Sequence, residues 1–211
     1  MARKFPLVKI LRGKLLEIAE FQDEVILSLV SKFKGIVFHD GTAIWRIYGG
    51  KRFSFDVDFY FPQPAKIKEF LKREFNVIKA KLTPSEVLYA RIRKDELEIE
   101  LNVSPPFKKV KVIEEEFFLT SGDTIVVRTL SPESLVKEKV ETFLKRKKAR
   151  DLYDIFSLLD LVEAGKVKSQ LRKLLPVSKP KDFDGLKSLI LVGVLPSFET
   201  LKRKIERYAK A

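Results

Sequence analysis

Residues 41–59 read GTAIWRIYGGKRFSFDVDF, and this stretch decides the fold of the chain. Asp56 and Asp58 alternate here with apolar side chains, which are Phe53, Phe55, Val57 and Phe59. Because successive side chains of a strand point to opposite faces, the pattern predicts a strand that turns its apolar residues one way and both carboxylates the other.

Two carboxylates side by side repel each other, at a cost of roughly 3 kcal/mol for a separation of about 5 Å and an effective dielectric constant of about 20. A cation between them removes this cost, and Mg²⁺ prefers oxygen ligands, with nucleotide phosphates completing its shell. Upstream, Gly41 and Thr42 offer backbone N–H groups and a hydroxyl at the start of a short helical run, which suits a phosphate. The alternative is a solvated strand face that follows an ordinary turn.

Two motifs in this chain resemble those of a known family. Gly41-Thr42, followed by Arg52-Phe53-Ser54-x-Asp56-x-Asp58, resembles the first motif of the AbiEii/AbiGii toxin-type nucleotidyltransferases, which belong to the DNA polymerase β-like superfamily. Residues 135–139 (LVKEK) and 147–154 (KKARDLYD) resemble the family's Glu-Lys helix and its Lys-Ala-Arg-Asp-x-x-Asp motif. The likeness covers roughly residues 33 to 165. One departure is Asp40, which stands where the family usually has the first glycine of a Gly-Gly pair.

The resemblance implies an α+β fold with a polymerase β-like core, in which flanking helices cover a mixed sheet. We expect this core and the N-terminal helices in residues 1–130, and a helical C-terminal part in residues 131–211. The implied reaction is transfer of a nucleoside monophosphate from an NTP with release of pyrophosphate, dependent on Mg²⁺ or Mn²⁺. The family further implies a toxin that is restrained by a separately encoded antitoxin.

A third carboxylate is expected on a strand beside the Asp-x-Asp strand, as a base for the acceptor hydroxyl or as a metal ligand. Residues 91–103 predict a hairpin that turns at Lys94-Asp95, and its second arm places Glu96, Glu98, Glu100 and Asn102 on one face. Glu100 is the first candidate and Glu98 the second. The alternative is an exposed acidic strand face.

The expected site residues fall into three groups. The predicted metal ligands are Asp56, Asp58 and Glu100, and the resemblance adds Lys139 and Asp151 to the catalytic set. The residues expected to bind the nucleotide are Gly41, Thr42, Arg52, Ser54, Lys139 and Asp154. Another interpretation is that Asp151 and Asp154, which share a helix face, only fix Lys139 and Arg150 as buried ion pairs.

The formal net charge is +13, which favours a polyanionic partner, most often nucleic acid. Residues 1–130 carry 23 basic and 18 acidic side chains, whereas the remaining 81 residues carry 19 and 11, so the excess leans toward the C-terminal part. The run Lys145, Arg146, Lys147, Lys148 and Arg150 is the expected RNA contact, with tRNA as the expected acceptor. An exposed interhelix loop, solubility charge or the Lys/Glu-rich surface of a thermophile would explain the same residues.

Composition excludes several other classes of site. The chain has no Cys, which excludes disulfides and Cys-based zinc sites, and its single His excludes a multi-His metal site within one chain. There is no apolar run of the ~20 residues that a membrane span needs, so a cytoplasmic location is expected.

Helical spacing predicts helices over residues 7–32, with a break near Phe21-Gln22-Asp23, and over 183–194 and 198–209. Ser131-Pro132-Glu133 has the cap, first-turn proline and first-turn acid that open a helix. Two other functions stay open: a nucleotidyltransferase that acts on a protein or small molecule, and an inactive relative that binds nucleic acid or a partner protein.

Overall fold

The chain forms two units in the computed structural model, which describes residues 7–106 and 111–211. The first unit contains the described residues of Met1–Ile47 and Ser54–Leu130, and the second contains Tyr48–Phe53 and Ser131–Ala211. The short segment Tyr48–Phe53 therefore groups with residues far along the chain, because Lys51 and Phe53 form backbone hydrogen bonds with Leu191 and Leu189.

The first unit is built on a mixed seven-stranded sheet. Its strands lie in the order β3-β4-β5-β2-β1-β7-β6, with β2 between the parallel strand β5 and the antiparallel strand β1. The elements in chain order are the 3₁₀ helix η1 (Leu7–Lys9), α1 (Lys14–Lys32), β1 (Val37–Phe38), α2 (Asp40–Arg46), β2 (Asp56–Tyr60), α3 (Pro64–Glu74), β3 (Asn76–Leu82), β4 (Leu88–Lys94), β5 (Leu97–Ser104), β6 (Val112–Phe118) and β7 (Thr124–Leu130). The predicted mixed sheet with flanking helices is confirmed. The alternation of residues 108–119 also predicts a strand; β6 covers Val112–Phe118 of this range, and residues 108–110 lie outside the described residues.

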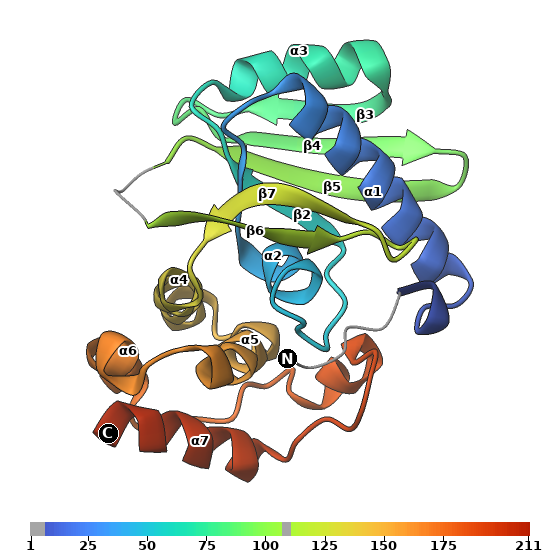
Figure 1. Cartoon of the computed structure of the whole chain (residues 1–211). Coiled ribbons are helices and arrows are strands. Elements are labelled where there is room, and N and C mark those ends of the chain that lie inside the picture. Colours follow the sequence, from blue (N-terminus) through green and yellow to red (C-terminus); the bar gives the residue numbers. More distant parts are fainter. Residues whose placement is uncertain (1–6, 107–110) are drawn as a thin grey trace. The chain divides into compact units, whose positions relative to one another are not determined.

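One face of the sheet carries the core of this unit. Helix α1 packs on β5, and α3 packs on β3 and β4 (Figure 1). The inward residues alternate with outward-facing ones along β2, β4 and β5, and they include Val57, Phe59, Leu88, Ala90, Ile92, Ile99, Leu101 and Val103. The prediction that Phe55 faces inward is wrong, because β2 begins only at Asp56 and the Phe55 side chain is 42% exposed.

The expected break at residues 21–23 is also wrong, because α1 runs unbroken from Lys14 to Lys32. The chain bends earlier, at Gly13, whose φ of 51° is one that glycine adopts readily. The polar residues that suggested a break are buried and bound to other elements. The Gln22 amide donates to the carbonyls of Ser54 (3.0 Å) and Phe55 (2.9 Å), which fixes the segment that enters β2.

Asp23 forms the main buried ion pair of the first unit. One carboxylate oxygen contacts the Arg46 guanidinium, and the other accepts hydrogen bonds from the Thr120 backbone N–H (2.7 Å) and hydroxyl (2.8 Å). Arg46 also donates from Nε to the Phe118 carbonyl at 2.7 Å. Burial lowers the pKa of Arg46 to about 9, so the guanidinium remains charged at neutral pH. This pair therefore ties α1 and α2 to the end of β6.

The second unit is helical. It contains α4 (Pro132–Arg146), α5 (Ala149–Leu158), η2 (Leu159–Leu161), α6 (Ala164–Leu171), η3 (Arg172–Leu174), η4 (Asp184–Leu189) and α7 (Phe198–Lys210). The predicted start of α4 is confirmed, since the Ser131 hydroxyl accepts from the Ser134 N–H. The helix expected over 183–194 is wrong in extent: only the 3₁₀ turn η4 forms, and Ile190 then bridges to Arg52. Among the described residues, no helix is long and apolar enough to cross a membrane.

The Asp23→Ala substitution tests the buried pair. It leaves Arg46 charged and buried without its carboxylate, so the free energy of unfolding should fall by about 3–5 kcal/mol. The matched control is Glu24→Ala on the same helix, where the partner Lys94 and Glu24 are both about half exposed. This control should change stability by less than about 1 kcal/mol. Urea denaturation measures both, and equal losses would contradict the assignment.

Candidate active site

The two carboxylates of β2 face away from the core of the first unit. Asp56 and Asp58 alternate with the buried Val57 and Phe59, and both acids are partly exposed. The neighbouring strand β5 places Glu100 beside Asp56 and Asn102 beside Asp58. The Asn102 amide donates to Asp58 Oδ1 at 2.9 Å, so this side chain orients one of the two carboxylates.

The start of α2 lies directly against β2. The Thr42 hydroxyl donates to the Asp56 carbonyl, and the His39 N–H donates to the Asp58 carbonyl at 3.2 Å. Thr42 is fully buried, so in this structure its hydroxyl serves to fix α2 to the carboxylate-bearing strand. The His39 ring stacks on Tyr60 of β2 at 3.9 Å between ring centroids, which adds a second contact.

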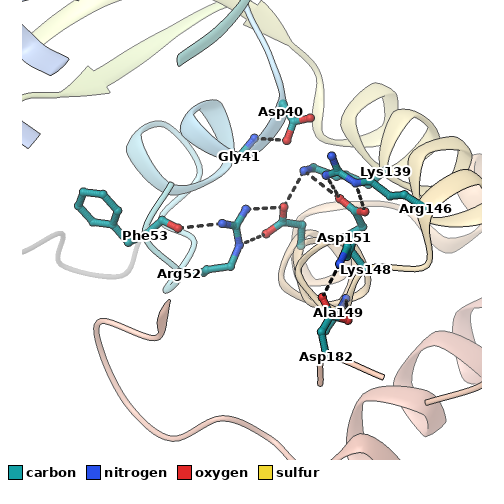
Figure 2. Close-up of polar contacts among 11 residues, drawn as sticks. Asp40, Gly41, Arg52, Phe53, Lys139, Arg146, Lys148, Ala149, Asp151 and Asp182 are labelled. Atoms are coloured by element: carbon teal, nitrogen blue, oxygen red, sulfur yellow. Dashed lines mark hydrogen bonds and ion pairs between the residues drawn. The ribbon is translucent and has the colours of Figure 1, made fainter. Parts of the chain in front are cut away.

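Asp40 is the first residue of α2, where the chain leaves β1, and its backbone is in a left-handed conformation. Its φ is 56°, in the region where glycine is favoured and aspartate is among the few other residues tolerated. The Gly41 N–H donates to Asp40 Oδ1 at 2.5 Å (Figure 2). The carboxylate of Asp40 therefore binds the amide that the sequence predicts for a phosphate.

The electrostatics of Asp58 favour a bound cation. Burial raises the pKa of the Asp58 carboxyl to about 7, the negative charges of Asp40 and Asp56 add to the rise, and His39 and the Asn102 hydrogen bond oppose it. The group is thus costly to ionise in the metal-free protein. A divalent cation with hard-oxygen preference fits these residues because it removes the repulsion.

Within the part of the chain that the structure describes, no three His, Cys, Asp or Glu side chains gather closely enough to hold a metal ion. Glu100, the predicted third carboxylate, is directed to β4 instead. There it accepts from Arg91 Nε at 3.1 Å, and this hydrogen bond and charge raise the pKa of Arg91. Of the three predicted metal ligands, Asp56 and Asp58 are therefore the two that could hold a cation without giving up another side-chain ion pair that the structure shows.

Ser54, predicted to bind the nucleotide, is buried ahead of β2. Its carbonyl is held by Gln22, as described above. The sequence gives no local signal for Gln22 or Asn102 as supports of this strand, because each acts on a residue more than 30 positions away.

The second unit brings Arg52, Lys139, Asp151 and Asp154 together in a buried network. Asp154 accepts two hydrogen bonds from Arg52, at 2.9 and 2.8 Å, and its Oδ2 lies 2.7 Å from Lys139 Nζ. Asp151 Oδ1 lies 3.6 Å from Lys139 Nζ. Arg146 joins the network with two hydrogen bonds to Asp151, at 2.7 and 2.6 Å (Figure 2).

These five side chains carry three positive and two negative charges. Burial acts to raise the pKa of Asp154, but Arg52 and Lys139 more than offset it, so the pKa lies below its usual range. Asp151 pairs with Arg146, where the ion-pair interpretation had expected Arg150. The carboxylates of the network thus hold its cations in place. Arg52 comes from the segment Tyr48–Phe53, which precedes β2 in the chain.

The basic run at the junction of α4 and α5 lines a pocket of about 630 Å³ within the second unit. Arg146, Lys148 and Arg150 contribute to its wall, as does Asp182. The Asp182 carboxylate accepts from the Ala149 N–H at 3.0 Å and lies 3.8 Å from Lys148, so it neutralises part of the charge at the start of α5 (Figure 2). Lys145 and Lys147 are exposed nearby.

The Asp58→Asn variant tests the electrostatic assignment. Unfolded, Asp58 loses its proton near 3.8, whereas in the folded protein it keeps the proton up to about 7. The free energy of unfolding of the wild type should therefore fall as the pH rises from 4 to 7, because Asp58 ionises more easily in the unfolded protein than in the folded one. The variant has no carboxyl at this position and lacks that loss. Its stability advantage should grow across this window and stay constant above pH 7, at about 4 kcal/mol.

Denaturation at a series of pH values measures this difference. Added Mg²⁺ at pH 8 should stabilise the wild type and not the variant, since bound cation removes the repulsion. An advantage that is equal at pH 4 and pH 8 would contradict the prediction.

Comparison with known proteins agrees with the two motifs. The family model described as nucleotidyl transferase AbiEii toxin, type IV TA system, matches residues 24–210. The solved structure of JHP933 from Helicobacter pylori is similar in fold, with a TM-score of 0.64 at 19% identity over 95% of this chain and 92% of that one. A candidate nucleotidyltransferase from H. pylori gives a TM-score of 0.60 at 21% identity, over 95% of each chain. No curated protein matches. The chain belongs to the AbiEii family and is a nucleotidyltransferase.

Proposed function

We propose that the chain transfers a nucleoside monophosphate from an NTP to an RNA acceptor such as tRNA, with Mg²⁺ or Mn²⁺ as cofactor. The observation that carries this proposal is the pair of carboxylates on β2, Asp56 and Asp58, which share the face opposite the core, with Asn102 hydrogen-bonded to Asp58. The basic pocket at the α4–α5 junction and the net charge of +13 support a polyanionic acceptor.

Asp56 and Asp58 hold the cation in this proposal, and Asn102 keeps Asp58 in place through its hydrogen bond. When bound, the metal supplies electrostatic stabilisation of the attacking and leaving oxygens. Lys139 and Arg52 supply fixed positive charge for the triphosphate, with Asp151 and Asp154 as the carboxylates that orient them. Gly41, Thr42 and Ser54 complete the proposed nucleotide set.

The chemical step joins the acceptor oxygen to the α-phosphorus and breaks the bond between the α-phosphorus and the oxygen that leaves with pyrophosphate. The acceptor hydroxyl loses a proton, and Glu100 is the proposed base, since it lies beside Asp56 on the adjacent strand. Glu100 would have to exchange its contact with Arg91 for the hydroxyl, and an acceptor phosphate is a suitable replacement partner for Arg91.

The family description names a toxin–antitoxin system, and we extend that role to this chain as a toxin restrained by a separately encoded antitoxin. Expression should then arrest growth, and Asp56→Ala should abolish the arrest. Arrest that persists in the Asp56→Ala variant would favour the inactive relative that only binds a partner or nucleic acid.

The direct test is incubation with each α-labelled NTP, Mg²⁺ and total RNA or total protein. Label should enter RNA, and tRNA should lengthen on a sizing gel. Asp56→Ala should reduce the rate on the order of a hundredfold or more, because it removes a ligand of the charge-stabilising cation. Label in protein or in a small molecule would replace the RNA acceptor with one of those classes.

Lys139→Met distinguishes a functional lysine from a structural one. Each carboxylate of the network retains an arginine bound through two hydrogen bonds in this variant, so the free energy of unfolding should change by less than about 1.5 kcal/mol. Transfer activity should nevertheless fall by at least about tenfold, because fixed charge near the phosphates is lost.

The matched control is Asp154→Ala, which removes the carboxylate that Arg52 binds through two hydrogen bonds and leaves Lys139 with Asp151 at 3.6 Å. It should cost about 3–5 kcal/mol of stability. A Lys139→Met variant that is as unstable as Asp154→Ala, or that keeps full activity, would assign Lys139 to the fold alone.

A further inference from the structure

The strands β3, β4 and β5 carry side chains that form two rows leading to the acids of β2. Residues paired across neighbouring strands point to the same face of a sheet. The backbone register therefore aligns one row of Lys81, Tyr89, Asn102 and Asp58, and a second row of Lys79, Arg91, Glu100 and Asp56. The hydrogen bonds from Asn102 to Asp58 and from Arg91 to Glu100 show one side-chain contact in each row.

This face is open to solvent, in contrast to the core face of the same strands. Tyr89 is 50% exposed, although its neighbours Leu88 and Ala90 are buried on the other side. The side chain of Arg91 is 46% exposed, and Lys79 and Lys81 are exposed as well. An aromatic ring that projects from a sheet among three cations serves no packing role in the core.

Charge changes sign along the rows. The acids lie on β2 and β5, and the cations lie on β4 and β3. With strands about 4.8 Å apart, Tyr89 stands two strands, or about 10 Å, from the backbone of Asp58. We name the group Lys79, Lys81, Tyr89 and Arg91 the basic strip. The basic strip ends beside the carboxylates of β2. A single-stranded nucleic acid bound along the strip would therefore place its end at Asp56 and Asp58.

We propose that the basic strip binds the single-stranded end of the acceptor RNA, with a base stacked on Tyr89 and phosphates contacted by Lys79, Lys81 and Arg91. Cations beside an exposed aromatic ring are the arrangement that single-stranded nucleic acid recognises, because every base offers a flat face and every nucleotide a phosphate. The inference rests on the proposed function, since it supplies the route by which the acceptor hydroxyl reaches Asp56 and Asp58.

The test measures binding without chemistry. A short 5′-fluorescein oligouridylate is titrated with the full chain in EDTA and without NTP, and anisotropy is followed at several salt concentrations. Tyr89→Ala should weaken binding about tenfold through lost stacking, and Tyr89→Phe should bind like the wild type. Lys79→Gln/Lys81→Gln should lower the slope of log K against log salt by about 1.4, since each lost phosphate contact on a single strand contributes about 0.7.

Lys68→Gln/Lys72→Gln on α3 is the matched control, because it removes the same charge from another element. It should leave the slope at the wild-type value. The inference is overturned if Tyr89→Ala binds like the wild type, if Tyr89→Phe loses as much as Tyr89→Ala, or if both lysine pairs change the slope equally. Polyglutamate that displaces the RNA with the same dependence on Tyr89 would overturn it in favour of an acidic protein ligand.

Labelled transfer to RNA is assayed separately, so that the two proposals can fail independently. If the wild type binds RNA through the basic strip but transfers no label to RNA, the proposed function is contradicted and the RNA-binding role of the strip is supported. If Tyr89→Ala still transfers label to RNA with an unchanged KM for RNA, the RNA-binding role of the strip is contradicted and the proposed function is supported.

Discussion

The alternation of side chains along β2 is the constraint on which the first unit depends. Val57 and Phe59 must enter the core between β5 and β1, so Asp56 and Asp58 are forced onto the opposite face together. A shift of one residue in register would bury both acids and expose both apolar side chains. The repulsion between the acids is therefore built into the strand. It persists because the burial of the apolar residues is worth more, and because a cation can relieve it.

Buried charges are handled differently in the two units. In the first, Asp23 saturates its carboxylate with Arg46 and Thr120, which leaves little capacity for a ligand and suits a structural tie. In the second, the buried side chains of Arg52, Lys139, Asp151 and Asp154 form a network that the partly exposed Arg146 joins, and each arginine binds a carboxylate through two hydrogen bonds. Cations that are fixed in this way are the groups that the proposed function uses to bind a triphosphate.

The sequence predicted the features that depend on local rules. Strand alternation placed the acids of β2 on one face, and the cap at Ser131 placed the start of α4. The predictions from the sequence were wrong where contacts with residues far along the chain determine the local structure. Gln22 and Asp23 looked like a helix break because their partners, Ser54 and Thr120, lie far along the chain. The helix expected over 183–194 shortened to a 3₁₀ turn, since Ile190 pairs with Arg52 instead of continuing the turn. The sequence placed Asn102 on the polar face of its strand but did not predict its hydrogen bond to Asp58, because that contact depends on the register of β5 with β2.

Asp40 shows how a departure from a family pattern can be read from backbone geometry. The turn before α2 needs a left-handed residue, which explains why a glycine is usual there, and aspartate meets the same need at the cost of some strain. Its carboxylate satisfies the Gly41 amide and at the same time adds to the repulsion felt by Asp58. In the proposed function these two effects act on different parts of the site: the first occupies an amide that the sequence predicts for a phosphate, and the second adds to the repulsion that a cation at Asp58 would relieve.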